Sequence, residues 1–484
     1  MKDYISHPPF FLDHNWIIRR SVFSMYYEKA NVYITNDKKI LFDLNKYDIY
    51  EIDDETFNLF EEIYFEVEKG VLFDENINES TPKKKEIYEL LFRFRNYNSS
   101  GERETTQIRI HTSNECNLKC KYCYANHGDY NQGQAIMTEE IAEKVADFIK
   151  LNFPKVKVIV FFGGEPLLGF KAIGKICEKM GKETHYIVNT NLTILNEEII
   201  KLINEYSINV TGSIDGPKEI HDLNRVYKRN GRGSFDIVRH NARKLMEETE
   251  YFDTVDAVYT LPAQKKYSKH QIAEYLYKEF KVKYIAIGDV ITEDETLKVE
   301  KEKVQDIEKE VEYVFDNIIA DRFIYLNEYS LPLISFFSKS YNDNFCTTGI
   351  SNITITASGD IWPCQLFIGR NEYHMGKIDF NDITNFDFKK FNKVSDNFYK
   401  IKKSRFSECQ KCIARYWCVK CLGAIQKNNL EENIITSECI NIRKITEIVL
   451  EKLGYYILNG NFEKLYGNLR KTTKGIEDKF LNVV

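Results

Sequence analysis

The chain has 484 residues, of which 43% are hydrophobic and 29% charged, and its formal net charge at pH 7 is −6. This length exceeds what one core supports, so about two to four domains are expected, and the acidic balance argues against a nucleic-acid partner. Residues 1–20 lack the apolar core of a signal peptide and no run of eighteen apolar residues occurs, which predicts a cytoplasmic protein without a membrane partner.

Residues 31–53 predict a β meander with turns at Asn36-Asp37 and Asn45-Lys46. The predicted strands are residues 31–35, 40–44 and 48–52. A helix capped by Asp54 should follow, because four apolar residues recur at helical spacing, namely Phe57, Phe60, Ile63 and Tyr64. A second helix is predicted over residues 83–95. Residues 1–100 are therefore expected to form a small α+β unit.

Residues 41–80 hold thirteen acidic residues and two lysines. A strongly acidic surface is commonly just solvated, or it meets a basic partner such as a lysine-bearing peptide. The sequence leaves both interpretations open.

A strand predicted over residues 107–111 leads into three cysteines, Cys116, Cys120 and Cys123, spaced as C-x-x-x-C-x-aromatic-C. A cluster of four irons takes four ligands, usually thiolates, so three cysteines leave one iron open. A structural zinc loop is the alternative, for which the nearby His127 offers a fourth ligand. In a reducing compartment the eleven cysteines are expected to bind metal rather than to form disulfides.

The cysteine spacing resembles the signature of the radical S-adenosylmethionine (SAM) enzymes. The resemblance implies that the open iron chelates the amino and carboxylate groups of SAM and that the aromatic residue, Tyr122, lies beside the adenine. It also implies that reduction cleaves SAM to methionine and a 5′-deoxyadenosyl radical. In such chemistry the protein holds cofactor and substrate and controls the electrons.

A second motif comes after a helix predicted at residues 139–151, which Thr138 should cap, and a buried strand at 156–162. The strand runs directly into Gly163, Gly164, Glu165 and Pro166. Paired glycines let a backbone come close to a ligand, and a carboxylate beside them can accept from an ammonium group. In the resembled family this turn holds the amino group of SAM.

Four further strands are predicted, at residues 184–189, 208–214, 254–260 and 284–290. Ser213 and Asp215 lie at the end of the second, where parallel α/β folds place their ligands. The resemblance assigns both residues to the ribose and carboxylate region of SAM. Asn189, at the end of the first of these strands, is a further candidate for contacting SAM.

Arginine is the expected partner of the methionine carboxylate, because a guanidinium grips a carboxylate with two hydrogen bonds. Arg225 is the first candidate, and Arg229 and Arg232 are the alternatives. Asp289, on the last predicted strand, is a candidate acid or base near the substrate.

Most of the remaining cysteines lie toward the C-terminus, in the order Cys346, Cys364, Cys409, Cys412, Cys418, Cys421 and Cys439. The arrangement resembles the SPASM extension of radical SAM maturases, which holds two auxiliary iron–sulfur clusters. One departure is that two residues, Val419 and Lys420, precede Cys421, where the family usually has three. Two zinc ribbons are the alternative.

Family topology assigns four thiols to an outer cluster, those of Cys409, Cys412, Cys418 and Cys439. Three thiols then remain for an inner cluster, those of Cys346, Cys364 and Cys421. Relatives with a fully ligated inner cluster carry another cysteine shortly before Cys346, whereas residues 336–345 have none. We therefore expect an open iron that a substrate thiolate occupies, or that a non-cysteine side chain or water fills. Cys177 is left over and is predicted to be a buried packing residue.

The predicted fold class is α/β, with six strands and intervening helices over residues 101–335, as in the partial (β/α)6 TIM-like barrel of the resembled family. Residues 1–100 resemble the winged-helix-like peptide-recognition (RRE-like) domain of ribosomal-peptide maturases, whose sheet edge accepts a leader peptide as an added strand. A structural extension is the alternative for this unit. A cysteine-rich SPASM domain is expected at 336–445 and a helical tail at 446–484.

These features predict a radical SAM maturase with three 4Fe–4S clusters that removes hydrogen from a residue of a ribosomally made precursor peptide and installs a thioether crosslink. The expected partners are that peptide, with its leader, and an electron donor such as flavodoxin or ferredoxin. An anaerobic sulfatase-maturase-like enzyme and a carbon–carbon crosslinking maturase are the alternatives within the superfamily. A non-catalytic metal-binding scaffold would explain the cysteines but not the turns at 163–166 and 213–217.

Overall fold

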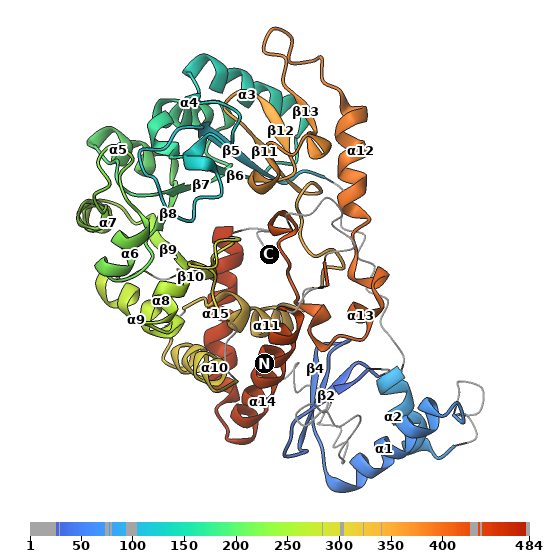
Figure 1. Ribbon diagram of the computed structural model, residues 1–484. Coiled ribbons are helices and arrows are strands. Elements are labelled where there is room, and N and C mark those ends of the chain that lie inside the picture. The colour runs from blue at the N-terminus through green and yellow to red at the C-terminus, as the bar shows by residue number, and fades with distance from the viewer. Residues whose placement is uncertain are drawn as a thin grey trace.

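A computed structural model describes the following residues: 26–28, 30–72, 77, 80–92, 104–282, 284–300, 304–322, 324–339, 341–425, 434–435 and 438–480. Within these residues no helix combines the length and apolar character needed to span a bilayer. Figure 1 shows the chain coloured from its N-terminus to its C-terminus.

The N-terminal unit is a four-stranded antiparallel sheet followed by two helices. The strands lie in the order β1 (Tyr26–Tyr27), β2 (Val32–Ile34), β3 (Ile40–Asp43) and β4 (Asp48–Glu51). The helices are α1 (Asp54–Glu68) and α2 (Pro82–Phe92). The three predicted strands are confirmed, and β1 adds a fourth. The predicted cap is wrong by one residue, because it is Asp53 whose side chain accepts from the Glu55 and Thr56 N–H groups.

The second predicted helix begins one residue before residue 83, at Pro82, which is tolerated in the first turn because its missing N–H would have no helical partner there. Residues 93–95 lie outside the described residues.

Both faces of this small sheet are covered. Val32, Ile34 and Leu41 share a core with the predicted apolar face of α1, which is buried as expected. Alternation along the strands turns Tyr33 and Phe42 to the other face. There Phe42 packs edge-on against Phe336 at 5.8 Å. The N-terminal sheet is thus packed between its own helices and the C-terminal part of the chain, which leaves β1 and β4 as its edges.

A larger sheet forms the centre of the molecule. Its six parallel strands are β5 (Gln107–Ser113), β6 (Val158–Gly163), β7 (His185–Thr190), β8 (Asn209–Ser213), β9 (Phe252–Tyr259) and β10 (Tyr284–Asp289). They lie side by side in sequence order. The six predicted strands and their parallel arrangement are confirmed, with ends shifted by up to two residues.

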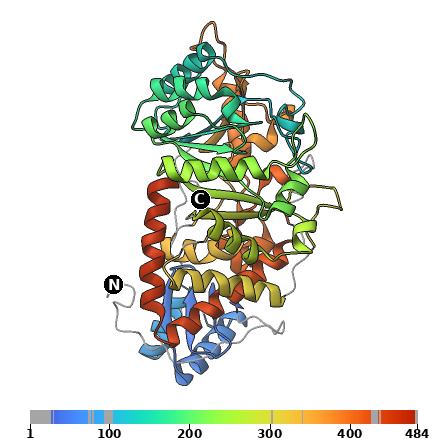
Figure 2. The ribbon, with the colours of Figure 1, turned by 90° about the vertical axis from the view of Figure 1, so that its left-hand side faces the viewer.

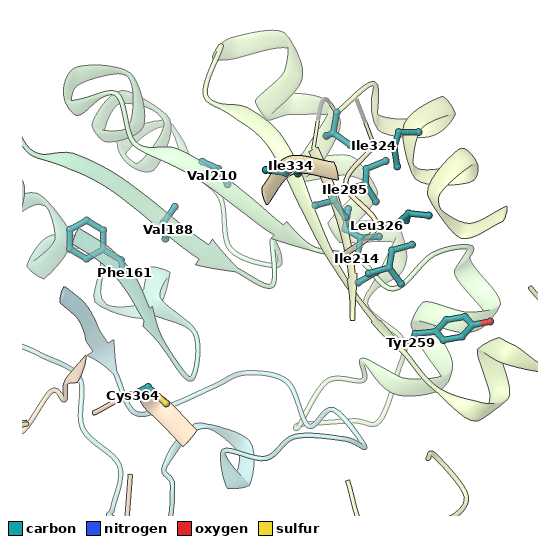
Figure 3. Close-up of a cluster of buried hydrophobic side chains, with 14 of the residues drawn as sticks. Phe161, Val188, Val210, Ile214, Tyr259, Ile285, Ile324, Leu326, Ile334 and Cys364 are labelled. Atoms are coloured by element: carbon teal, nitrogen blue, oxygen red, sulfur yellow. The ribbon is translucent and has the colours of Figure 1, made fainter. Parts of the chain in front are cut away.

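Helices cover one face of this sheet (Figure 1). They are α3 (Glu139–Asn152), α4 (Phe170–Met180), α5 (Glu197–Tyr206), α6 (Lys218–Asn224), α7 (Phe235–Glu248), α8 (Leu261–Gln264), α9 (Lys269–Phe280) and α10 (Val304–Ile319). Thr138 caps α3 as predicted, since its side chain accepts from the Ile141 N–H. Figure 3 shows Phe161, Val188 and Val210 on the successive strands β6, β7 and β8, all part of the main core.

The opposite face of the sheet carries polar side chains next to a small apolar cluster of Val158, Val160 and Ile187. Pairing places Arg109 beside Val160, Asn189 beside Thr211, and Ser213 beside Asp256. Because side chains alternate along each strand, these residues point away from the apolar core that the helices cover. The side that the helices leave uncovered therefore presents hydrogen-bonding and charged groups from several strands.

The C-terminal part adds strands to the same sheet, which the sequence did not predict. Its elements are α11 (Asn327–Ser338), β11 (Asn352–Ile355), β12 (Asp360–Trp362), β13 (Gly376–Lys377), α12 (Phe388–Tyr399), α13 (Ser407–Gln410), α14 (Glu438–Leu458) and α15 (Phe462–Phe480). β11 pairs in parallel with β5, so the sheet grows to nine strands.

Two predicted domain boundaries lie within helices, and the division into domains stays a prediction. The boundaries at 335/336 and 445/446 fall inside α11 and α14. Figure 2 shows the N-terminal unit at the end of the molecule opposite to α3 and α4.

Candidate active site

The first cysteine cluster follows β5 and forms a compact loop. Cys116 Sγ accepts a hydrogen bond from the Leu118 N–H at 3.4 Å, and Cys123 Sγ accepts from the His127 N–H at 3.3 Å. All three thiols of the loop are half-buried. Burial raises the pKa of Cys116 to about 12 and that of Cys120 to about 11. Because metals bind the thiolate, uptake of a cluster here has to release these protons.

The predicted glycine pair packs closely on the backbone of the cysteine loop. A Cβ on Gly164 would lie 2.2 Å from the Glu115 carbonyl oxygen, and one on Gly163 would lie 2.1 Å from that of Ser113. The two N–H groups of Gly164 and Glu165 donate to these same carbonyls at 2.8 and 2.7 Å. The glycines therefore let the turn after β6 pack directly on the backbone of the cysteine loop. Their predicted contact with SAM stays a prediction.

Glu165 is fully buried and fastens two strand ends together. Its carboxylate accepts from Thr190 Oγ1 at 2.7 Å and from the Asn191 N–H at 2.8 Å. Burial raises its pKa to about 7, although these hydrogen bonds oppose the shift. Asn191 in turn donates through Nδ2 to Cys116 Sγ at 3.8 Å. Glu165 thus acts on the cysteine loop through its neighbours, and its predicted role toward an ammonium group is untested.

Three predicted residues meet at a buried ion pair. Arg225 Nε donates to Asp215 Oδ1 at 3.0 Å, and Tyr122 Oη donates to Asp215 Oδ2 at 2.6 Å. Burial holds the pKa of Tyr122 well above its usual value, so the phenol remains a donor. The Arg225 guanidinium also lies 5.5 Å from the centre of the Tyr122 ring. Asp215, with no exposed surface, thereby orients the arginine and the aromatic residue of the cysteine motif together.

A buried histidine supports Asp215 from behind. His221 Nδ1 accepts from the Asp215 N–H at 3.4 Å, and its Nε2 lies 3.0 Å from Ser234 Oγ. The Ser234 hydroxyl donates to the Arg225 carbonyl at 2.8 Å, which leaves its oxygen to accept from His221 Nε2–H. Burial lowers the pKa of His221 to about 4, so the ring is neutral and fits this pattern.

Asp256 was missed by sequence reasoning. It lies on the polar face of β9 beside Ser213, and Asn189 Nδ2 donates to its Oδ2 at 3.4 Å. Burial raises its pKa to about 6, while the charge of Arg225 opposes the rise. The available signal was an acid between two apolar residues, Val255 and Ala257, on a predicted strand. Asn189, Ser213 and Asp256 thus extend the site from the cysteine loop across the sheet.

The other charged candidates lie apart from this group. Asp289 is half-exposed and pairs with the buried Lys269 at 3.0 Å, and Lys269 also pairs with Glu328 at 2.6 Å. Its predicted role as an acid or base remains a prediction. Arg229 and Arg232 are exposed, whereas Arg225 is buried within the site.

The C-terminal cysteines fall into the two predicted groups. Four thiols line one cavity of about 30 Å³, those of Cys409, Cys412, Cys418 and Cys439. Burial raises the pKa of Cys421 to about 12, and the nearby thiols of Cys364 and Cys346 contribute to the rise. Cys421 still reaches the surface. Cys177 is fully buried on α4, as predicted.

In the described part of the chain, no three His, Cys, Asp or Glu side chains converge on a point where one metal ion would sit. An iron–sulfur cluster distributes its thiolates over several irons. The four thiols around one small cavity therefore match the donor set of a cluster.

A larger cavity of about 450 Å³ is lined by residues that adjoin the two cysteine regions in sequence. Tyr124, next to Cys123, lines one side, and Ile291, which follows β10, lines another. The segment after Cys364 lines a third side through Gln365 and Leu366. Gln365 Oε1 accepts from Arg109 Nη1 at 2.6 Å, which ties this segment to the polar face of β5. The walls of the cavity thus come from segments that follow β5, β10 and β12.

Comparison with known proteins supports this description. Over 345 residues the chain is 26% identical to the cysteine-type anaerobic sulfatase-maturating enzyme of Clostridium perfringens, spanning 66% of this chain and 90% of that protein. The solved structure of native anSMEcpe with bound AdoMet and Kp18Cys peptide has a TM-score of 0.59 at 21% identity and covers 73% of this chain and 99% of its own. Streptococcus suis SuiB bound to precursor peptide SuiA has a TM-score of 0.50 at 18% identity, with 81% and 94% covered.

At these identities the two structures indicate a shared fold. Residues 110–276 match the family model of the Radical SAM superfamily. This range contains the cysteine loop, the glycine turn and the Asp215–Arg225 pair, and what each of them binds stays a prediction. The chain therefore contains a radical SAM domain.

Proposed function

We propose that this protein is a radical SAM maturase that installs a thioether crosslink in a precursor peptide. SAM bound at an iron–sulfur cluster supplies a carbon radical that removes hydrogen from unactivated carbon. The tasks left to the chain are to hold the cofactor, to present a peptide beside it and to conduct the surplus electron. Each task has a candidate group of residues.

Cys116, Cys120 and Cys123 are proposed to ligate the cluster, which leaves one iron for SAM. Arg225 is proposed to bind the methionine carboxylate, because Asp215 fixes its Nε edge and so orients the guanidinium. Tyr122 shares that anchor, and its ring would lie against the adenine. Asn189 and Ser213, on the same polar face of the sheet, are proposed to bind the ribose region.

The observation that carries the proposal is the cavity of about 450 Å³ between the cysteine loop and the segment after Cys364. Its size is that of typical ligand pockets. A peptide side chain seated there would touch Tyr124 and Gln365 at once. Hydrogen removal at one wall and sulfur coupling at the other would then need no large movement of the peptide.

The thiol count at the inner site favours a thioether over other products. Cys346, Cys364 and Cys421 provide three ligands, so an iron would be open to the sulfur of a peptide cysteine. Metal ligation lowers the pKa of a thiol and keeps it as the reactive thiolate. A second cavity, of about 380 Å³, reaches Cys346 from the side of α11. A non-cysteine side chain or water at the open iron is the alternative.

The N-terminal sheet is proposed to hold the leader of the peptide. β4 pairs only with β3 within the described sheet, so its other edge offers backbone groups to an added strand. The acidic character of residues 41–80 suits a basic leader. The outer cysteines are proposed to hold the cluster that exchanges electrons with a carrier such as flavodoxin or ferredoxin.

A sulfatase-modifying activity is the second candidate, favoured by the alignment over 90% of the sulfatase-maturating enzyme. The test is anaerobic incubation of the reconstituted chain with SAM, a reductant and one peptide at a time. The peptides are a cysteine-rich precursor encoded beside the gene and a sulfatase segment with its target cysteine. Mass spectrometry reports the product.

Loss of two hydrogen atoms from the precursor, with one cysteine no longer alkylated, supports the thioether. The same loss with every cysteine still alkylated indicates a carbon–carbon crosslink instead. Modification of the sulfatase segment alone supports the second candidate. An unmodified precursor under conditions in which SAM is cleaved contradicts the proposal.

A further inference from the structure

A buried cationic side chain borders the proposed outer cluster. Lys403 is 3% exposed and lines the same small cavity as Cys409, Cys412 and Cys418. Its Nζ donates to the Arg415 carbonyl oxygen at 2.8 Å and lies 5.5 Å from the centre of the Tyr341 ring. A lysine is almost never this buried unless its charge is compensated.

No carboxylate forms an ion pair with Lys403 in the described part of the chain. Asp343 acts on it electrostatically, but the Asp343 carboxylate already accepts from Tyr341 Oη, the Ser404 N–H and Ser404 Oγ. The thiols of Cys409, Cys412 and Cys418 also act on Lys403. As thiolates around a cluster, they would supply the missing negative charge.

Two more cations border the same site. Arg443 lines the cavity, and the buried Lys420 donates to the Ile434 carbonyl oxygen while acting on Cys409 and Cys418. The cation that acts on Cys364 of the inner site is Arg109, which is bound to Gln365. Three cations, Lys403, Lys420 and Arg443, therefore adjoin the outer thiols, and Lys403 also lines the cavity of about 380 Å³ that reaches Cys346.

Cluster potentials respond to net charge and solvent exposure. Reduction adds one negative charge to the cluster, and a buried cation stabilises that added charge more strongly than an exposed one, because solvent screens it less.

We propose that Lys403 is a positioning residue that raises the reduction potential of the outer cluster and so draws the surplus electron outward. The inference rests on the proposed function. Coupling of a carbon radical to a thiolate forms one C–S bond and leaves one electron. This electron would first reduce the inner cluster, then pass to the outer one, and finally leave to a one-electron carrier.

The test is a redox titration of the full, reconstituted chain followed by electron paramagnetic resonance. The outer cluster is the signal that disappears in Cys409→Ala. Lys403→Met should lower its equilibrium constant for reduction at least tenfold, which is 59 mV for one electron, and shift that of the inner cluster less. Lys411→Met is the matched control, since Lys411 adjoins Cys412 but its side chain is 67% exposed. It should shift the constant less than twofold.

Lys403→Arg keeps the charge and should hold the equilibrium constant for reduction within twofold of that of the wild type. This variant also controls for misfolding of the methionine variant. An unshifted outer signal in Lys403→Met overturns the inference and leaves the proposed function standing. A Lys403→Arg shift as large as that of methionine overturns it as well. If Cys409→Ala removes neither iron nor signal, the outer cluster itself is refuted and the inference fails with it.

Discussion

The buried pair of Asp215 and Arg225 predicts a specific energetic signature. Asp215→Asn keeps the shape of the side chain but removes its charge, so Arg225 is left buried and uncompensated. Asp215 also accepts from Tyr122 Oη and from the Val258 N–H at 3.1 Å, and the amide oxygen of asparagine can keep only part of this set. Removal of one partner of a buried ion pair lowers the free energy of unfolding by about 3–5 kcal/mol. We expect about 3 kcal/mol for Asp215→Asn.

Arg225→Met should cost a similar amount, because it leaves the carboxylate unpaired instead. The double variant removes both charges. Its loss of unfolding free energy should therefore be about 2 kcal/mol smaller than the sum of the two single losses. SAM binding should not recover with stability. The double variant still lacks the guanidinium proposed to grip the methionine carboxylate, so its affinity should stay at least about tenfold below that of the wild type.

The assay is anaerobic urea unfolding of the four chains, followed by circular dichroism, with SAM affinity from equilibrium dialysis. Lys218→Met is the matched control, because Lys218 forms an exposed ion pair with Asp236 on neighbouring helices. It should cost less than about 1 kcal/mol. If Asp215→Asn costs no more than this control, or if the two single effects simply add, the buried pair is refuted.

Two further variants test the packing of the site and the docking of the N-terminal sheet. Gly164→Ala should displace the cysteine loop and lower iron uptake, since the new Cβ would meet the Glu115 oxygen. The control is Gly174→Ala in α4, where the new Cβ would lie 3.5 Å from its nearest neighbour. This control should take up the normal amount of iron, and its free energy of unfolding should rise by up to about 1 kcal/mol. Burial raises the pKa of Glu451, the acceptor of Tyr33 Oη, to about 7. Because folding raises the pKa of this acid from about 4.5 to about 7, the folded protein is most stable below pH 4.5. Its free energy of unfolding should fall by about 3 kcal/mol as the pH rises from 4.5 through 7. Glu451→Gln should therefore show a flatter decline in urea stability between pH 5 and 8, and parallel curves would contradict the assignment.

Much of the parallel sheet was predictable because its signals are local. Buried strands such as residues 156–162 and capped helices such as the one after Thr138 carry their pattern in a few adjacent residues. The cysteine spacing at 116–123 is local in the same way. The cap at Asp53 rather than Asp54 shows the usual limit, since neighbouring acids are chemically equivalent until the backbone geometry is known.

The parts that sequence could not supply depend on long-range contacts. Nothing near residue 352 indicates that β11 would pair with β5, yet this pairing joins the segment that bears Cys364 to the sheet that carries the first cysteine loop. Likewise, the close packing of Gly164 on Glu115 could not be predicted, because Glu115 lies 49 positions earlier along the chain. Asp256 gained significance only when the sheet register set it beside Ser213.

The central claim is that Cys116, Cys120 and Cys123 hold a SAM-binding iron–sulfur cluster in a working enzyme. It is tested most directly by measuring iron, zinc and 5′-deoxyadenosine after anaerobic reconstitution of the full chain and of its triple alanine variant, with Cys177→Ala as control. We predict about twelve irons per chain, falling to about eight in the triple variant together with complete loss of 5′-deoxyadenosine, and no change for Cys177→Ala. Zinc in place of iron, or undiminished SAM cleavage by the triple variant, would contradict the account.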